Sequence, residues 1–337
     1  MNAKVESISL GMVIAEDVFD KNGLLLVPKD TIVTEHIIMH LLKSAIFSIK
    51  VKDNWIQDIN YSKFNEIYTQ AISDVKSTFD SIKRKKNVEL SDFENIVEEL
   101  LTKSESMWSI LPYIKLLEDK DEYTLRHSIN VSITAMLMAK WLKYKKADIK
   151  LLGITAMLHD IGKIQIPNTI LNKPGSLTDM EYNIMKSHTK LGFELLKKSG
   201  NDAVKNVALT HHERVNGKGY PFGLVGTYIS QNAKIVAICD VYDAVTSRRV
   251  YKQKESPLKG LNVILDDSYN GLDPYLCKIF LTNVAMAYNG CKVSLNDGRI
   301  GKIINVPLEN PSKPWVVIND LFYDLAKSSN LEVVDIL

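Results

Sequence analysis

A set of histidines and aspartates in the middle of the chain has the residue types and spacing of a metal site. Of the seven histidines, five lie between residues 119 and 288, each inside or beside an apolar stretch. A buried histidine needs a hydrogen-bond partner or a metal ion, and for a single histidine the hydrogen bond is the ordinary explanation. Several segments that each deliver one or two such residues indicate a metal centre instead. Its expected ligands are His127, His159, Asp160, His188, His211, His212 and Asp240.

The expected centre holds two divalent ions. Neighbouring residues on a helix point about 100° apart, so His159 and Asp160 can serve one centre only where a helix ends or where the ions lie between them. Gly162 permits such an ending, and the two oxygens of Asp160 can bridge two cations. We expect the other ligands to form two groups: His127, His159 and Asp240 on one ion, and His188, His211 and His212 on the other. Imidazole and carboxylate ligands together favour iron, manganese, zinc or nickel over magnesium or calcium.

This ligand set predicts hydrolysis of a phosphoester. Two metal ions about 3.5 to 4 Å apart can hold a hydroxide at neutral pH, direct it at phosphorus and stabilise the leaving oxygen. Asp160 is the catalytic carboxylate that is expected to hold both ions. Lys163, three residues later, is placed to contact a phosphate oxygen, and a solvated lysine at a helix end is the alternative. We also expect cations near the motifs to complement the substrate phosphates, namely Arg214, Lys218 and Arg249.

Helices must position most of these side chains. Helical periodicity dominates from residue 119 to about 288, and Thr178 followed by Glu181 has the spacing of a capping box. On one predicted helix, His127 shares a face with Val131, Ala135 and Met138. In the helical segment that starts at Thr178, His188 shares a face with Ile184, Leu191 and Leu195. We therefore expect both imidazoles to point into the protein interior.

The chain divides into four predicted segments. Residues 1–52 combine short strands with one helix into a small α/β module, and residues 53–118 form a helical linker. Residues 119–290 form the metal-dependent hydrolase domain. Residues 291–337 return to strands, with a hairpin turn at Asn296-Asp297-Gly298, and form a small β appendage. The expected fold class is mainly α, a helical bundle with an N-terminal α/β module and a C-terminal β appendage.

Composition limits the class of ligand and the location. Hydrophobic residues make up 45% and charged residues 24% of the 337 residues, as in ordinary globular proteins. A formal charge of +2 gives no global field for a nucleic acid polymer, so a small anionic ligand is expected. The three separated cysteines favour a reducing compartment, the cytoplasm. No run reaches the roughly 18 apolar residues of a membrane span, and the N-terminus lacks the pattern of a signal peptide.

Three motifs resemble those of the HD-GYP family, a branch of the HD phosphohydrolase superfamily: HDIGK at residues 159–163, HHERVNGKGYP at 211–221 and CDVYDAVTSRRVYK at 239–252. The resemblance covers about half of the chain. It implies an all-helical bundle with a two-metal site, usually iron with manganese as the alternative. It also implies hydrolysis of the bacterial messenger cyclic di-GMP, with linear pGpG or GMP as the product. Position by position, it implies metal binding at the seven residues named above and phosphate contact at Lys163.

The loop that ends in Gly219-Tyr220-Pro221 carries the family signature. Its glycines and proline fix a tight turn next to Lys218. The resemblance implies that this loop belongs to the substrate environment or docks a protein partner, and a rigid turn over the site is the alternative. Tyr123 stands where family members with a third metal carry glutamate, so two metals are expected. The residues on either side of the matching Arg249 differ from the family pattern.

Three functions are compatible with the sequence. The first is a cyclic di-GMP phosphodiesterase, and the second is a phosphohydrolase for another cyclic dinucleotide or nucleotide, because metals define the chemistry but not the base. The third is a catalytically silent sensor of cyclic di-GMP, against which the intact ligand set argues. Asp243, one turn beyond Asp240, is either a support for a ligand or a surface aspartate. The N-terminal module is a candidate site for a protein partner, and the oligomeric state stays open, with a homodimer as one option.

Overall fold

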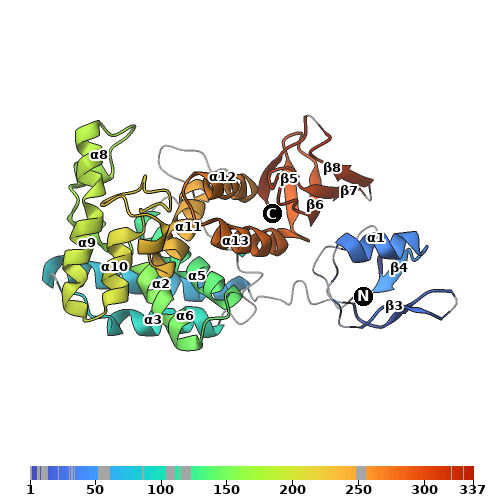
Figure 1. Cartoon of the computed structure of the whole chain (residues 1–337), viewed down its shortest axis with the longest axis horizontal. Helices are drawn as coiled ribbons and strands as arrows, with labels where there is room; N and C mark the ends of the chain where they lie inside the picture. Colours follow the sequence, from blue (N-terminus) through green and yellow to red (C-terminus); the bar gives the residue numbers. More distant parts are fainter. Residues whose placement is uncertain are drawn as a thin grey trace.

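The computed structural model contains a helical body, a small α/β module near the N-terminus and a β-sheet at the C-terminus (Figure 1). This architecture confirms the expected fold class. The structure describes residues 2–5, 8, 14–21, 23–29, 31, 33, 35–51, 61–85, 87–103, 111–112, 114, 123–247, 256–319, 321–328 and 330–337.

Two antiparallel strand pairs and one helix form the N-terminal module. β1 (Asn2–Lys4) pairs with β4 (Ser48–Lys50), and β2 (Val18–Phe19) pairs with β3 (Leu25–Val27). The helix α1 (Glu35–Lys43) precedes β4. Apolar side chains of the module form a buried cluster that is separate from the core of the helical body, with members such as Val5, Ile8, Ile14 and Leu41. The module therefore has an apolar interior of its own.

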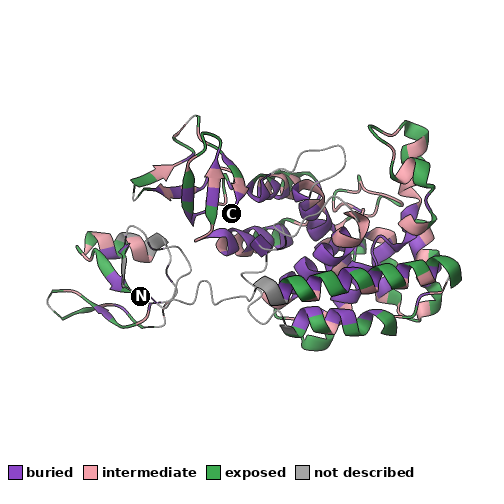
Figure 2. Ribbon diagram, turned by 180° about the vertical axis from the view of Figure 1, so that it is seen from behind, coloured by how far each residue is buried: buried purple, intermediate pink, exposed green. Residues whose placement is uncertain are grey.

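One helix lies at the centre of the helical body. In α5 (Tyr123–Trp141) every residue from His127 to Ala139 is buried, so this helix has no solvent-facing side over most of its length. Figure 2 shows the same contrast in colour, with the buried helices of the body next to the exposed outer faces of the others. The other α-helices of the body are α2 (Tyr61–Lys85), α3 (Ser91–Lys103), α6 (Lys146–Met157), α7 (Asn168–Leu171), α8 (Asp179–Lys186), α9 (His188–Leu196), α10 (Asp202–Thr210), α11 (Gln231–Thr246), α12 (Pro257–Asn270) and α13 (Pro274–Tyr288).

The first two helices of the body belong to the same hydrophobic core as α5. Phe79 of α2 and Val97 of α3 are buried in the cluster that also contains Val131 of α5 and Val293 of the C-terminal sheet. The segment expected to be a linker thus contributes core side chains, while the boundaries at residues 52, 118 and 290 stay predictions. None of the described helices is long and apolar enough to cross a membrane.

A five-stranded antiparallel sheet forms the C-terminal part, in the order β8-β7-β6-β5-β9. The predicted hairpin turn is confirmed: Leu295 N donates to Arg299 O at 2.9 Å, and Gly298 has a φ of +85°, which glycine adopts without strain. The strands predicted for residues 291–337 are present. The strands are β5 (Lys292–Leu295), β6 (Ile300–Asn305), β7 (Trp315–Ile318), β8 (Leu321–Asp324) and β9 (Val333–Ile336).

The predicted common face of Ile184 and His188 is wrong, because the helix breaks between them. The capping box at Thr178 starts α8 as expected, with Glu181 as its reciprocal partner. However, α8 ends at Lys186, and a new helix, α9, starts at His188. Ile184 is 38% exposed, whereas His188 is 1% exposed. The break therefore lets α9 turn His188 into the interior while α8 stays on the surface.

Candidate metal centre

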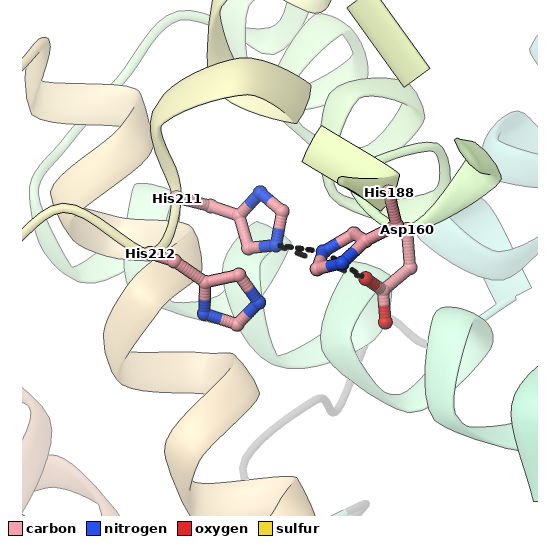
Figure 3. Close-up of side chains that lie close together, drawn as sticks. All are labelled: Asp160, His188, His211 and His212. Atoms are coloured by element: carbon pink, nitrogen blue, oxygen red, sulfur yellow. Dashed lines mark hydrogen bonds and ion pairs between the residues drawn. The ribbon is translucent and has the colours of Figure 1, made fainter. Parts of the chain in front are cut away.

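Helix ends and buried helix faces bring the seven expected residues to one place. His159 and Asp160 lie between the end of α6 and the short 3-10 helix η4 (Ile161–Gln165). His211 and His212 follow α10, and His188 is the first residue of α9. The other two, His127 and Asp240, lie within α5 and α11. Figure 3 shows Asp160, His188, His211 and His212 turned toward one another.

Asp160 lies between two groups of histidines. Its Oδ1 is 3.2 Å from Nε2 of His188 and 3.7 Å from Nε2 of His211. Its Oδ2 is 3.3 Å from Nε2 of His159 and 3.6 Å from Nε2 of His127. The carboxylate is only 2% exposed. Each oxygen of Asp160 therefore faces a different pair of imidazoles.

Asp240 contacts both groups. Its Oδ1 lies 3.2 Å from Nε2 of His127 and 3.9 Å from Nε2 of His159, and its Oδ2 lies 3.9 Å from Nδ1 of His212. The residues form three overlapping sets, and within each set the ligand atoms lie within 4.8 Å of one another. The sets are Asp160 with His188, His211 and His212; Asp160 with His127 and His159; and Asp240 with His159 and His211. Asp160 is shared by the first two sets, as expected of a bridging ligand, and the exact division of ligands stays a prediction.

The hydrogen bonds of the imidazoles leave their Nε2 lone pairs directed into the cluster. Nδ1 of His159 lies 2.6 Å from Ala156 O, and Nδ1 of His188 lies 2.7 Å from Met185 O. A carbonyl oxygen only accepts, so Nδ1 carries the proton and Nε2 is unprotonated in the neutral ring. Nε2 of His159 and Oδ1 of Asp160 are buried without a hydrogen-bond partner. Both atoms are hydrogen-bond acceptors, and buried acceptors that face each other have no proton to share. A divalent cation between them would satisfy both.

Asp160 and Asp240 are ionised in this cluster. Burial raises the pKa of the Asp160 carboxyl, but the opposing effects, of which the positive charge of Lys163 is the largest, hold this pKa well below its usual range. Asp240 has the same balance, with the hydrogen bond from His127 as the main opposing effect. Burial lowers the pKa of His127, yet hydrogen bonds to Asp240 and Asp243 outweigh it and raise the pKa to about 9. A cation must therefore displace a proton from His127.

Three of the imidazoles are neutral at neutral pH. Burial is the main cause that lowers the pKa of His188, of His211 and of His212. Neutral imidazole is the form that binds metal. These three side chains are thus in the ligand-competent state before any ion binds.

Of the side chains expected to bind phosphate, Lys163 lies at the carboxylate cluster, whereas the other described ones do not. Lys163 Nζ contacts Oδ2 of Asp160 and is 25% exposed, so it lies at the edge of the cluster. Arg214 instead donates to the main-chain carbonyls of Glu213 and His211. Lys218 is exposed, and Arg249 lies outside the described residues. Among the cations described, Lys163 is the one placed at the carboxylates.

The Gly219-Tyr220-Pro221 loop packs directly on the segment that carries the paired histidines. The Tyr220 ring stacks on the His212 ring, with centroids 4.6 Å apart, and Tyr220 N donates to His212 O at 3.2 Å. A Cβ at Gly219 would lie 2.4 Å from Arg214 N and 2.5 Å from His212 O. This close approach explains why the position requires glycine.

Two side chains beside this loop were not among the residues expected from the sequence. Glu213 is 3% exposed, and its two oxygens accept from Phe222 N at 2.8 Å and Leu224 N at 2.9 Å. Lys186 Nζ lies 4.9 Å from the ring centroid of Tyr182 and 5.9 Å from that of Tyr220. Position next to the paired histidines was the available signal for Glu213, but it does not distinguish a ligand from a loop anchor.

Asp243 is buried against the expected ligand His127 and is not a surface aspartate. It is 2% exposed, and its Oδ2 lies 2.7 Å from Nδ1 of His127. A carboxylate that accepts from the second ring nitrogen fixes the orientation of the imidazole and the position of its proton.

The helical part of the chain matches a known family over residues 113–276, described as HD domain. A cyclic di-GMP phosphodiesterase of Pseudomonas aeruginosa is 38% identical over 191 residues, which are 56% of this chain and 46% of that protein. A cyclic di-GMP phosphodiesterase response regulator of Xanthomonas campestris is 43% identical over 142 residues, 41% of this chain and 38% of that protein. This chain thus spans about half, or less, of the length of these curated relatives.

A solved structure, an HDG"Y"P protein from Bdellovibrio bacteriovorus, has a similar fold. Its TM-score is 0.53 at 15% sequence identity, and the similarity covers 83% of this chain and 97% of that chain. The family match, the HDIGK and GYP motifs and the helices that carry them agree. Residues 113–276 belong to the HD domain family, and the HDIGK and GYP motifs within them resemble those of its HD-GYP branch.

Proposed function

We propose that this protein is a metal-dependent phosphodiesterase that hydrolyses cyclic di-GMP to linear pGpG and onward to GMP. The observation that carries the proposal is the buried carboxylate of Asp160, whose two oxygens face separate groups of histidines. The curated relatives named above act on cyclic di-GMP according to their names, and their likeness supports this substrate. The three free thiols, Cys239, Cys277 and Cys291, support a cytoplasmic setting.

The proposed ligands divide as the sequence suggests. His127, His159 and Asp240 hold one ion, His188, His211 and His212 hold the other, and Asp160 holds both. Iron is the preferred metal and manganese the alternative, because both accept mixed imidazole and carboxylate ligands. When bound, such a pair supplies Lewis-acid activation of the attacking water and of the phosphoryl oxygens.

The surrounding side chains bind and orient the dinucleotide. Lys163 contributes a positive charge beside Asp160, where a phosphate oxygen of the substrate accepts from its ammonium group. The GYP loop forms one wall, because Tyr220 covers the ring of His212 and limits access of bulk water to it. Lys218 and Arg249 are proposed to contact the phosphates, whereas the main-chain hydrogen bonds of Arg214 support a role in holding the loop.

Lys163→Met is expected to lower kcat/KM for cyclic di-GMP by about 10- to 100-fold with both ions retained. A hydrogen bond to a charged group contributes about 1.5–3 kcal/mol, and about 1.4 kcal/mol corresponds to tenfold. Methionine keeps the apolar stem and removes only the charge. The measurement is steady-state kinetics together with metal analysis of the same sample. Lys197→Met, which removes a half-exposed surface lysine paired with Glu194, is the matched control. Equal kcat/KM in both variants would identify Lys163 as a solvated lysine.

Glu213→Gln is expected to raise KM for cyclic di-GMP about tenfold, with kcat and metal content nearly unchanged. The amide would turn an N–H toward the main-chain N–H of Phe222 or Leu224, so one of the two loop anchors is lost. Substrate titrations of the variant and of the surface control Glu194→Gln check this result. If the variant melts at a lower temperature but keeps its KM, Glu213 stabilises the fold without shaping the site.

The proposed function is tested by anaerobic purification, metal quantification and product analysis with cyclic di-GMP. About two ions per chain and the appearance of pGpG, followed by GMP, are the expected results. A parallel panel with other cyclic dinucleotides separates the alternative substrates, because the metals do not select the base. Binding of cyclic di-GMP without turnover in fully loaded protein would replace the hydrolase by a sensor.

A further inference from the structure

A chain of buried hydrogen bonds connects α2 to the proposed ligand His127. Tyr68 OH donates to Asn130 Oδ1 at 2.6 Å, and Asn130 Nδ2 donates to Asp243 Oδ1 at 3.0 Å. The other oxygen of Asp243 lies 2.7 Å from Nδ1 of His127. None of these four residues is more than 3% exposed. They come from three helices, α2, α5 and α11.

The donor and the acceptor of each hydrogen bond between Tyr68 and His127 follow from the chemistry of the four side chains. The carboxylate of Asp243 only accepts, so Asn130 must present its NH₂ group to Asp243 and its carbonyl oxygen to Tyr68. Tyr68 must then donate to that oxygen. On the other side, Nδ1 of His127 must donate to Asp243, which in the neutral ring leaves Nε2 unprotonated for a metal.

From this arrangement we propose that Tyr68 is a positioning residue for His127, and that the docking of α2 thereby sets the affinity of the centre for one of its two metal ions. Tyr68 lies outside residues 113–276, the part that matches the HD domain. The support of the centre therefore extends into a helix that precedes that domain. The inference rests on the metal site of the proposed function.

Tyr68 can affect His127 because its hydroxyl restrains Asn130, and Asn130 in turn restrains Asp243. Without Tyr68 OH, the buried oxygen of Asn130 loses a donor, and an unsatisfied buried polar group costs about 1–3 kcal/mol. The amide can relieve this cost by rotating, and its donation to Asp243 is then weakened. Asp243 in turn holds His127 less firmly, and loss of such outer partners typically weakens metal binding about 10- to 100-fold. A signal that displaces α2 would act on the centre in the same way.

The experiment is a Mn²⁺ titration of the metal-free full-length chain in competition with a chelator, comparing wild type with Tyr68→Phe. We expect the variant to bind one of its two ions about tenfold more weakly, with the other binding step unchanged. A second readout is the proton on Nδ1 of His127, observed by NMR in the Zn²⁺-loaded chain. Its resonance should move in the variant, which a purely structural role of Tyr68 would not produce.

Tyr288→Phe is the matched control. Tyr288 is fully buried, and its hydroxyl lies 2.9 Å from that of Tyr242. Its replacement removes one buried hydroxyl from the same helical body, on a residue that is not a member of the hydrogen-bond chain to His127. It should lower thermal stability without changing either Mn²⁺ step. If both Mn²⁺ binding steps and the Nδ1 resonance are unchanged in Tyr68→Phe, this inference is wrong, while the proposed function is unaffected. If wild-type protein binds no Mn²⁺, the metal site of the proposed function fails as well.

Discussion

Asp160→Asn is expected to lower the rate of cyclic di-GMP hydrolysis by at least about 10³-fold and to leave no more than one ion per chain. Asparagine keeps the shape of the side chain but replaces one oxygen by an NH₂ group, which cannot bind a cation. Oδ1 faces His188 and Oδ2 faces His159, at 3.2 and 3.3 Å, so either orientation of the amide removes a ligand from one group. Metal assistance contributes several kcal/mol, and each 1.4 kcal/mol or so is tenfold in rate.

The measurement combines single-turnover kinetics with metal analysis, because the two effects must occur together. Asp202→Asn is the control: the Asp202 side chain is 81% exposed and pairs only locally with Lys205, so rate and metal content should remain at the wild-type values. A variant at Asp160 that keeps two ions and hydrolyses substrate at the wild-type rate would exclude a shared carboxylate. Loss of one ion with an undiminished rate would show that one metal is sufficient for the chemistry.

The convergence of the seven residues could be predicted from the sequence because they lie at helix ends or on buried helix faces. Adjacent residues on a helix diverge, so the pairs His159-Asp160 and His211-His212 required an ending next to each of them. The structure has these endings: α6 stops at Met157, and α10 stops at Thr210. The all-round burial of α5 near His127 also follows from its run of apolar and small residues.

The hydrogen bonds from Tyr68 through Asn130 to Asp243 could not be predicted from the sequence. The spacing of apolar residues identifies the buried face of a helix but not the polar group that lies opposite it. Tyr68 and Asn130 are 62 residues apart, and Asn130 and Asp243 are 113 residues apart. Each of these residues, taken alone, could be a hydrogen-bonded core residue anywhere in the fold. The break between Ile184 and His188 was missed for a related reason. A helix can end and restart without glycine or proline, as α8 and α9 do here.

Gly162→Ala is expected to lower the free energy of unfolding by about 3 kcal/mol or more and to abolish metal binding. Gly162 lies in η4, where a Cβ would be 1.9 Å from His188 O and 2.5 Å from Gly192 N, both main-chain atoms. No change of rotamer relieves such a clash, so η4 and α9 must move apart, and overpacking of this kind costs at least the usual 1–3 kcal/mol or so. Asp160 directly precedes η4 and His188 is the first residue of α9, and a displacement of about 1 Å is enough to cost roughly 10²-fold in a catalytic geometry.

Two other glycines make this prediction specific. At Gly226 the nearest atom to a new Cβ is 3.5 Å away, an ordinary contact, so Gly226→Ala should keep its melting temperature and metal content. At Gly153 the nearest atom is Met136 Sδ at 2.7 Å, and a flexible thioether can move aside, so that variant should lose stability but retain both ions. Thermal melts and metal analysis of the three variants then give a graded series. Equal metal content in Gly162→Ala and Gly153→Ala would mean that η4 and α9 adapt without separating Asp160 from His188, and that the centre does not depend on their close approach.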